Sequence, residues 1–358
     1  MTTRFRASVY RVAASGPDDI SGVEALIAGG LDPHGIVAVL GKTEGNGCVN
    51  DFTRGFATAT FEGLFARLGV EGVSIVMSGG TEGALSPHWT IFAREQVEAP
   101  AIFAPPRRSL AIGVSRTADL LPEHLGRKEQ VDLVAQGVRA AMANAGIDDP
   151  ADVHFVQIKC PLLTSAKVAQ AQARGKRTVI ADTLKSMGYS RGASALGVAV
   201  ALGELGMDDV EDTDICRTLD LYSARASTSA GVELADHEII VLGMSDQWTG
   251  PFEMTHTVMW DAMDAPSVRA AWSALPLGRL AAVLAKAEPD PRGTVRGRRH
   301  IMLDDSDISG TRHARAFVGG VLAGVFGETE LYVSGGAEHQ GPPGGGPVAI
   351  IVEREEWA

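Results

Sequence analysis

Short apolar runs alternate with amphipathic segments along the whole chain. Apolar runs of strand length occupy residues 35–42, 110–115, 154–159, 239–243 and 348–352. Apolar spacings of three and four, which are typical of helices, occupy residues 53–68, 128–145, 164–174, 265–274 and 311–325. Because strands and helices are interleaved, this pattern predicts a fold of the α/β or α+β class.

Other segments show weaker strand or helix patterns. Residues 5–12, 178–181 and 256–259 are predicted strands, and residues 20–29 and 190–205 are predicted helices. We expect strand 239–243 to pair with the strand that ends near Ser229. Three prolines and two arginines in residues 100–108 indicate a linker.

One short motif occurs three times, each time after an apolar or weakly apolar run. It reads Ser-Gly-Gly-Thr-Glu at 78–82, Ser-Ala-Gly-Val-Glu at 229–233 and Ser-Gly-Gly-Ala-Glu at 334–338. A strand that ends in serine and small residues presents a hydroxyl and unhindered N–H groups, which suits a nucleophile or an oxyanion site. Three copies indicate an internal threefold repeat, with units at 1–104, 110–250 and 255–358.

Two other features recur in the same order in each unit. A lysine ends an apolar run at Lys42, Lys159 and Lys286. A hydroxyl–arginine pair follows at Thr53-Arg54, Ser190-Arg191 and Thr311-Arg312. We expect each hydroxyl to cap a helix N-terminus. Any one of these residues alone is typical of a solvated surface, but the threefold recurrence favours a shared site.

If the units surround a pseudo-threefold axis, the lysines, arginines and serines converge on one pocket. Burial and neighbouring arginines would lower the pKa of a lysine there, so that it could take the proton of a serine hydroxyl. The arginines and the N–H groups after each serine would hold a developing oxyanion. Such a pocket suits a small, flat, cyclic imide. The residues alone leave open which of the three lysine–serine pairs reacts; Ala230 is the one visible asymmetry.

Charge and composition exclude several classes of function. A net charge of −12 argues against nucleic acid and against an anionic membrane surface as partners. No run of eighteen apolar residues is present, and the three cysteines have no CxxC spacing. These features predict a cytoplasmic protein with free thiols.

Other segments resemble known binding motifs but lack the spacing that those motifs require. Gly41-Lys42-Thr43 ends like a phosphate-binding loop, but Ile36 stands where its first glycine is needed. Residues 304–307 lack the glycine and glutamate of a calcium loop, and the histidines form no HExxH pair. The carbonyl-rich loop 341–347, together with Glu288, could hold Mg²⁺ or Ca²⁺.

With these residues in view, the chain resembles the cyanuric acid amidohydrolase/barbiturase family. The motifs that carry the resemblance are 41–51 (GKTEGNGCVND), 77–83 (MSGGTEG), 159–163 (KCPLL), 187–197 (MGYSRGASALG), 295–300 (VRGRRH) and 334–341 (SGGAEHQG). The resemblance implies three similar units around a pseudo-threefold axis, with sheets forming a central barrel-like core, in a homotetramer. It implies ring-opening hydrolysis of cyanuric acid to carboxybiuret, which loses CO₂ to give biuret, without an organic cofactor.

The resemblance also implies roles for individual residues. Ser229 would be the nucleophile and Lys159 its general base, with Lys42 and Lys286 in the other two pairs. Substrate contacts would fall on Arg54, Ser78, Gly79, Arg191, Ser229, Ala230, Arg312, Ser334 and Gly335. A structural cation, Mg²⁺ or Ca²⁺, would be held by Glu288, Ala337, Gln340, Gly341, Pro342 and Gly345. Two alternatives stay open: barbiturate ring opening on the same scaffold, and a non-catalytic binder of small planar anions.

Overall fold

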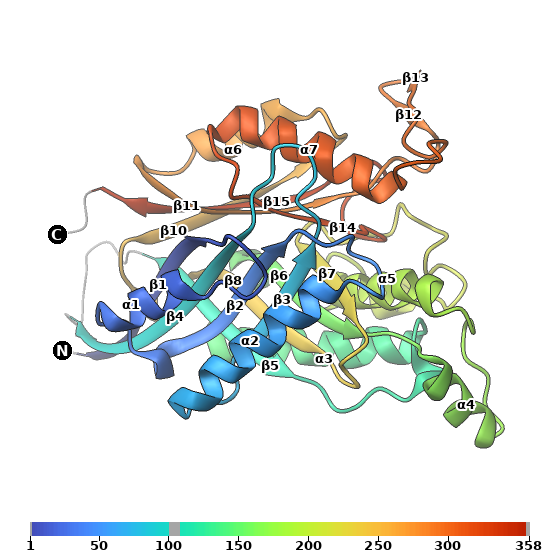
Figure 1. Cartoon of the computed structure of the whole chain (residues 1–358), viewed down its shortest axis with the longest axis horizontal. Coiled ribbons are helices and arrows are strands. Elements are labelled where there is room, and N and C mark those ends of the chain that lie inside the picture. Colours follow the sequence, from blue (N-terminus) through green and yellow to red (C-terminus); the bar gives the residue numbers. More distant parts are fainter. Residues whose placement is uncertain (1, 100–107, 356–358) are drawn as a thin grey trace.

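The computed structural model describes residues 2–99 and 108–355, in which strands and helices are interleaved as the pattern predicts. The predicted linker at 100–108 lies outside the described residues, apart from Arg108. Most of the strands belong to three sheets, each with helices on one face (Figure 1). The fold is therefore of the mixed α/β class.

The three sheets share one strand order. The first contains β1 (Thr2–Ala13), β2 (Ile36–Thr43), β3 (Ser74–Gly79) and β4 (His88–Ala99), in the order β3-β2-β4-β1, with β9 (Trp248–Thr249) added beside β1. The second contains β5 (Ser109–Arg116), β6 (Val153–Pro161), β7 (Ala226–Gly231) and β8 (Glu238–Ser245), in the order β5-β8-β6-β7. The third contains β10 (Phe252–Met259), β11 (Gly278–Ala287), β14 (Tyr332–Gly335) and β15 (Gly346–Arg354), in the order β10-β15-β11-β14. A small hairpin of β12 (Thr294–Val295) and β13 (Arg298–Arg299) stands apart.

The pairing directions also agree. In each sheet the first strand is antiparallel to the last, the last is antiparallel to the second, and the second is parallel to the third. The third strands β3, β7 and β14 are edge strands, so the described strands form separate sheets and no closed barrel. This corrects the expected barrel-like core. It also corrects the pairing expected for residues 239–243: β8 pairs with β5 and β6, because β6 lies between β8 and β7.

Helices cover one face of each sheet (Figure 1). The first sheet carries α1 (Ser21–Ala28) and α2 (Phe52–Leu68), and the third carries α6 (Ala265–Ser273) and α7 (Gly310–Phe326). The second carries α3 (Lys128–Ala145) and α5 (Thr183–Ala201), and α4 (Ser165–Ala173) lies to one side.

Most elements fall where the pattern predicts, but several do not. The helix expected from residue 190 begins at Thr183, because the Asp182 side chain accepts a hydrogen bond from the N–H of Lys185 and caps it there. Residues 178–181 are not a strand. The long strand β4 was not predicted.

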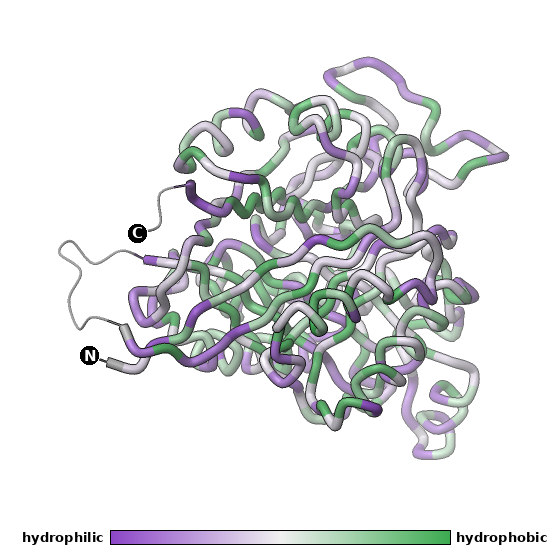
Figure 2. The backbone as a smooth tube through the Cα atoms, turned by 60° about the vertical axis from the view of Figure 1, so that its left-hand side comes forward, coloured by the Kyte–Doolittle hydropathy of each residue, from purple (hydrophilic) through white to green (hydrophobic). Residues whose placement is uncertain are grey.

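Side-chain alternation separates two cores in the first sheet. Ala38 and Leu40 belong to the large central core, which also contains residues of the other two sheets, whereas Val39 packs under α1 and α2. In Figure 2 the hydrophobic (green) stretches of the backbone tube lie mainly in the interior, where the strands of the sheets contribute to the central core. Lys42, two positions after Leu40, therefore points toward the centre of the molecule.

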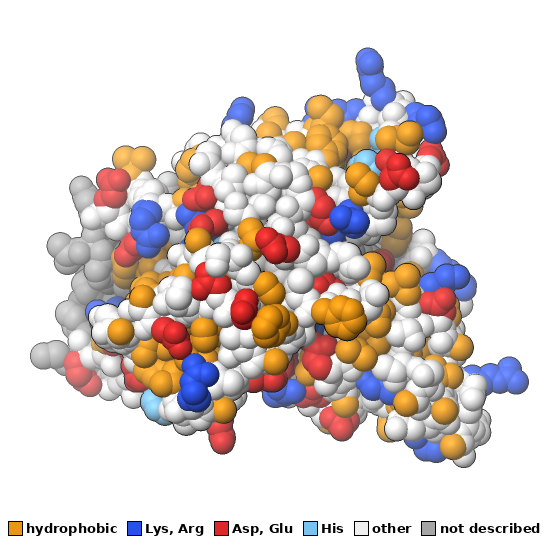
Figure 3. Space-filling model, viewed as in Figure 1, with side chains coloured by type: hydrophobic (Ala, Val, Ile, Leu, Met, Phe, Trp, Pro, Cys, Tyr) orange, Lys and Arg blue, Asp and Glu red, His pale blue; other side chains and the backbone are white. Residues whose placement is uncertain are grey.

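The surface offers no single charged face in the view of Figure 3, where acidic, basic and apolar side chains are intermixed. None of the described helices combines the length and the apolarity that a membrane crossing requires.

Candidate active site

The parallel strand pair of each sheet brings one lysine opposite one serine. Because the second and third strands pair in the same register in all three sheets, the partners are Lys42 and Ser78, Lys159 and Ser229, and Lys286 and Ser334. All six side chains are buried. The repeated motif thus becomes a repeated geometry.

Lys42 is bonded to its serine. Its Nζ donates to Ser78 Oγ at 3.3 Å and to the carbonyl of Val333, in another sheet, at 2.8 Å. Burial lowers the pKa of Lys42 well below its usual value, and the nearby Arg315 guanidinium lowers it further. This is the neutralising effect expected from the sequence.

Lys286 makes the corresponding contacts. Its Nζ donates to Ser334 Oγ at 3.2 Å, to the Gly335 carbonyl at 3.0 Å and to the Thr228 carbonyl at 2.9 Å. Burial, with Arg191 as the next contribution, lowers the pKa of Lys286 to about 7. Val333 and Thr228 each precede the serine of another copy, so the lysines link the sheets.

Lys159 differs from the other two lysines. Its Nζ lies 2.7 Å from Glu233 Oε1, and in the described part of the chain it makes no hydrogen bond to Ser229. Ser229 Oγ instead lies 3.5 Å from Ser334 Oγ. The hydroxyls of two copies are therefore neighbours.

Three arginines line the cavity between the serines, and one of them was not expected. Arg54 and Arg191 line the cavity between the serines, but the third is Arg315. The Arg315 side chain is 4% exposed, whereas that of Arg312 is 42% exposed. Arg312 Nε bonds Glu82 Oε1 at 3.1 Å outside the cavity lining. Arg315 follows one helical turn later on the same face of α7, which is the signal that could have found it.

The cavity is small and closely lined. Its volume is about 30 Å³. It adjoins a larger cavity of about 660 Å³ that is also lined by Gly47, Met187, Arg191, Arg315 and Gly335. The smaller cavity is lined by Gly47, Arg54, Met77, Ser78, Gly79, Met187, Arg191, Ser229, Ala230, Arg315, Ser334 and Gly335. Every expected substrate-contact residue except Arg312 is in this set.

Carboxylates from other copies of the motif hold two of the arginines. Glu338 bonds Arg191 at 2.6 and 2.8 Å, and Glu82 bonds Arg315 at 2.6 and 2.9 Å. Burial would lower the pKa of Arg191, but Glu338 outweighs it and raises that pKa. These pairs fix the guanidinium groups at the cavity wall.

The expected capping by hydroxyls is wrong. Asp51 caps α2 by accepting from the N–H groups of Thr53 and Arg54, and Ser190 lies inside α5 rather than at its start. Ser309 precedes α7 without a side-chain capping bond, so Thr311 does not cap it either. A carboxylate accepts several N–H groups at once and competes well for this position.

The proposed cation ligands surround a cavity of about 220 Å³, with Glu288, Ala337, Gly341, Pro342 and Gly345 among the lining residues. Gln340 does not line this cavity. It is buried, and its Oε1 accepts from the Thr228 N–H at 2.7 Å. The loop therefore also supports the strand that carries Ser229.

Glu288 is the one carboxylate of this proposed ligand set. Its oxygens accept from Thr311 Oγ1 at 2.8 Å and from the Gly336 N–H at 2.6 Å. Burial raises its pKa, and the neighbouring Glu338 raises it further. Within the described ranges, no cluster of three His, Cys, Asp or Glu side chains could hold a metal. One carboxylate and several carbonyl oxygens are nevertheless the donor chemistry that a hard cation prefers.

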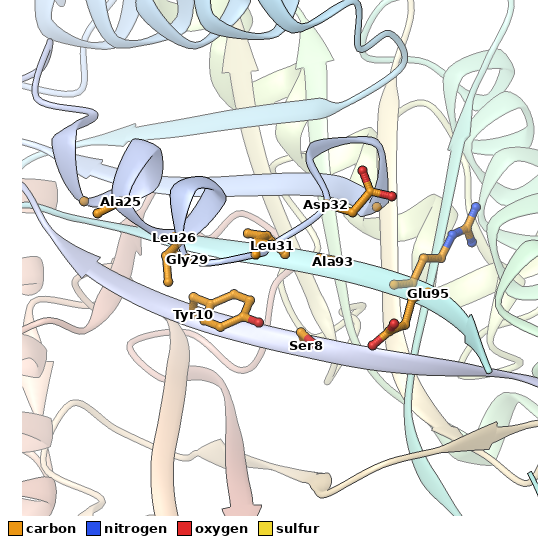
Figure 4. A pocket seen from close by; sticks show the side chains of 13 residues that line it. Ser8, Tyr10, Ala25, Leu26, Gly29, Leu31, Asp32, Ala93 and Glu95 are labelled. Atoms are coloured by element: carbon orange, nitrogen blue, oxygen red, sulfur yellow. The ribbon is translucent and has the colours of Figure 1, made fainter. Parts of the chain in front are cut away.

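A separate cavity of about 490 Å³ lies between α1 and the strands β1 and β4 (Figure 4). Its lining includes Ser8, Tyr10 and Glu95 but no lysine. Arg94, which also lines it, donates to Asn144 Oδ1 at 2.9 Å. This cavity does not repeat the lysine–serine geometry.

Known proteins share both the sequence and the fold. The model of the family described as "Amidohydrolase ring-opening protein" matches residues 8–353. The chain is 71% identical over 353 residues to a cyanuric acid amidohydrolase of Rhizobium johnstonii, covering 98% of this chain and 99% of that protein. It is 53% identical over 364 residues to a cyanuric acid amidohydrolase of Ectopseudomonas oleovorans, covering 97% and 99%.

Two solved structures superpose on nearly the whole chain. The cyanuric acid hydrolase from A. caulinodans has a TM-score of 0.92 at 57% identity, covering 98% of this chain and 100% of that one. A second cyanuric acid hydrolase, described as an evolutionary innovation by structural concatenation, has a TM-score of 0.92 at 49% identity, with the same coverage.

Proposed function

The chain belongs to the amidohydrolase ring-opening protein family, and on this premise we propose that it hydrolyses cyanuric acid by opening its ring. The observation that carries the proposal is the convergence of three serines, each paired in register with a buried lysine, and of three arginines on one cavity. Cyanuric acid has three equivalent carbonyl groups, so each could meet one serine and one arginine. The relatives named above act on the same compound.

Acyl transfer needs a nucleophile, a base and a site for the oxyanion. We assign Ser229 as the nucleophile and Lys159 as the base, following the family resemblance. Ser229 Oγ attacks a ring carbonyl while Lys159 accepts its proton and then delivers it to the leaving ring nitrogen. Guanidinium and backbone N–H groups at the cavity wall stabilise the negative oxygen. Water then releases carboxybiuret, which loses CO₂ to give biuret.

The symmetry of this site is part of the proposal. Three units at 1–104, 110–250 and 255–358 would surround a pseudo-threefold axis through the cavity. The shared strand order and the lysine–serine register support this arrangement. The description of a close structural relative as a product of concatenation agrees with it.

A cation site, a homotetramer and a cytoplasmic location complete the proposal. Glu288 and the oxygens of Ala337, Gln340, Gly341, Pro342 and Gly345 would hold Mg²⁺ or Ca²⁺. A bound cation would supply positive charge that compensates the partly buried Glu288 and Glu338, and would stiffen the loop whose Gln340 supports Thr228. Arg312, half exposed beside Glu82, stays a predicted substrate contact without support from the cavity lining.

Incubation of the protein with cyanuric acid, followed by detection of biuret and CO₂, tests the activity. We expect turnover with cyanuric acid and little with barbituric acid. Ring opening of barbituric acid alone would reassign the protein to the barbiturase alternative. Binding of cyanuric acid without turnover would make it a non-catalytic binder.

A further inference from the structure

The glutamate that ends the repeated motif has different partners in the three copies. Glu82 bonds Arg315, Glu338 bonds Arg191, and Glu233 bonds Lys159. Two copies thus hold an arginine of another unit, and the middle copy holds the lysine of its own unit. The sequence of the motif does not explain this difference, because glutamate occupies the same position in all three.

The third residue of the motif is a glycine in all three copies, and the side chain that lies next to it differs between the copies in the same way. A Cβ on Gly80 would lie 2.4 Å from an Arg315 nitrogen, and a Cβ on Gly336 would lie 2.5 Å from the Arg191 guanidinium. A Cβ on Gly231 would lie 2.4 Å from both Lys159 Cε and Glu233 Oε1. The space above this glycine therefore holds an arginine in two copies, and Lys159 with its Glu233 partner in the third.

In two of the copies the motif glutamate bonds an arginine of another unit, and Arg54 is the cavity arginine that has no such glutamate. Glu82 lies in the first unit and bonds an arginine of the third; Glu338 lies in the third and bonds an arginine of the second. Continuing the cycle, Glu233 of the second unit would bond Arg54 of the first. Among the described residues, Arg54 Nε is buried without a hydrogen-bond partner. Its nearest carboxylate oxygen, Asp51 Oδ2, is 3.5 Å away.

We propose that Glu233 is the positioning residue of Lys159, holding its ammonium group beside Ser229 and moving to Arg54 when substrate enters the cavity. This inference rests on the proposed function. Glu233 suits the role because its side chain is 45% exposed, whereas that of Lys159 is 3% exposed. It can therefore exchange protons with water while it touches a buried lysine.

The proton balance of this step is simple. The ammonium proton of Lys159 passes to the Glu233 carboxylate and from there to water, which leaves a neutral lysine. Glu233, again a carboxylate, then pairs with Arg54. Neutral Lys159 accepts the hydroxyl proton as Ser229 Oγ attacks, and gives it to the leaving nitrogen.

Several charged groups surround the pair and belong to the same balance. Lys159 lies opposite Glu238 on β8 and next to Cys160 along its own strand, while Glu233 lies near Arg54 on α2 and Lys167 on α4. Burial raises the pKa of Glu233, but its contact with Lys159 outweighs burial and holds that pKa below its usual value. The carboxylate form is the form present beside Lys159.

The pH profile of Glu233→Gln, with Glu82→Gln as the matched control, tests the proposal. Without the carboxylate, the ammonium form of Lys159 loses its counter-ion. We therefore expect the acid limb of kcat/KM to move about one pH unit lower and kcat to fall about tenfold, while KM rises, because the substrate complex loses the carboxylate proposed to pair with Arg54. Glu82→Gln should raise KM through Arg315 and leave the acid limb in place.

The outcomes separate this inference from the proposed function. An unmoved acid limb in Glu233→Gln, or the same shift in Glu82→Gln, overturns the positioning role while wild-type turnover stands. Absence of wild-type turnover with cyanuric acid overturns the proposed function instead. If Glu233→Gln fails to fold, Glu233→Asp serves: we expect the acid limb near wild type and a reduced kcat, and a wild-type kcat counts against the role.

A crystal of Ser229→Ala soaked with cyanuric acid tests the movement directly. We expect the Glu233 carboxylate within hydrogen-bond distance of the Arg54 guanidinium. A Glu233 that stays on Lys159 with cyanuric acid in the cavity overturns the exchange.

Discussion

The Lys286–Ser334 pair and the Lys159–Ser229 pair occupy the same register on the same kind of strand pair, yet their surroundings differ. Lys286 donates to a serine and two carbonyls, with no carboxylate bonded to it in the described part of the chain. Lys159 contacts a carboxylate that reaches solvent. Equal backbone geometry therefore does not give equal chemistry; the groups around each ammonium decide whether it has a counter-ion and a route for its proton.

The largest effect should come from the hydroxyl that attacks. We expect Ser229→Ala to lower turnover about a thousandfold or more while cyanuric acid still binds. Ser334→Ala, the matched control at the corresponding position, should lower it about tenfold, because it removes only one contact to the ring. Steady-state rates and calorimetric binding measure both. The reverse order of the two effects would assign the reaction to the third sheet.

The next effect should separate the two arginines of α7. Arg315→Met removes a buried guanidinium from the cavity wall, so we expect kcat/KM to fall about a hundredfold. Arg312→Met removes a half-exposed group and should cost less than about threefold. Kinetics on both variants check this. A larger loss for Arg312 would return the third substrate contact to the residue expected from the sequence.

A smaller effect concerns stability and pH. Lys286 has a folded pKa of about 7, below its unfolded value, so the unfolded state binds more protons between these two values. Its contribution to the free energy of unfolding therefore rises as pH increases from about 7 toward 10, by at most about 1.4 kcal/mol per pH unit. Denaturant titrations of wild type and Lys286→Met should differ by an amount that grows in favour of wild type over this window. A pH-independent difference would contradict the burial argument.

The smallest effect should come from Ala230, which stands where the other two motifs have glycine. Ala230→Gly makes the middle copy match the others but loosens a buried strand, so we expect a loss of about 0.5–1 kcal/mol of stability. Turnover should change less than about threefold, because the asymmetry that matters lies in the partners of Lys159. Thermal unfolding and kinetics measure the two quantities. A large change in turnover would place the asymmetry at Ala230 itself.

Repetition in the sequence was the most informative signal. It predicted that the three lysines and the three serines converge, and the structure pairs Lys42, Lys159 and Lys286 with their serines, because parallel pairing of two adjacent strands preserves register across insertions. It named Arg312 and did not predict Arg315, which lines the cavity, because the match of Thr311-Arg312 to Thr53-Arg54 says nothing about which turn of a helix faces the cavity. It also missed the caps, since Asp51 and Asp182 lie before the matched residues.

The partners of the glutamates could not be predicted. Glu82, Glu233 and Glu338 occupy equivalent positions in the sequence, and whether each meets an arginine or a lysine depends on how distant segments pack. The strand order could not be predicted either, because an apolar run such as that of β8 does not specify which strands will pair with it.

The bonds that hold the arginines join remote parts of the polypeptide. Glu82 and Arg315 are 233 positions apart, and Glu338 and Arg191 are 147 apart. A ribosome must therefore complete nearly the whole chain before both of these guanidinium groups are held, and a fragment that lacks one sheet would lose a wall of the pocket. Activity should consequently emerge in a single step during synthesis, and two inactive halves should regain it only when they reassociate.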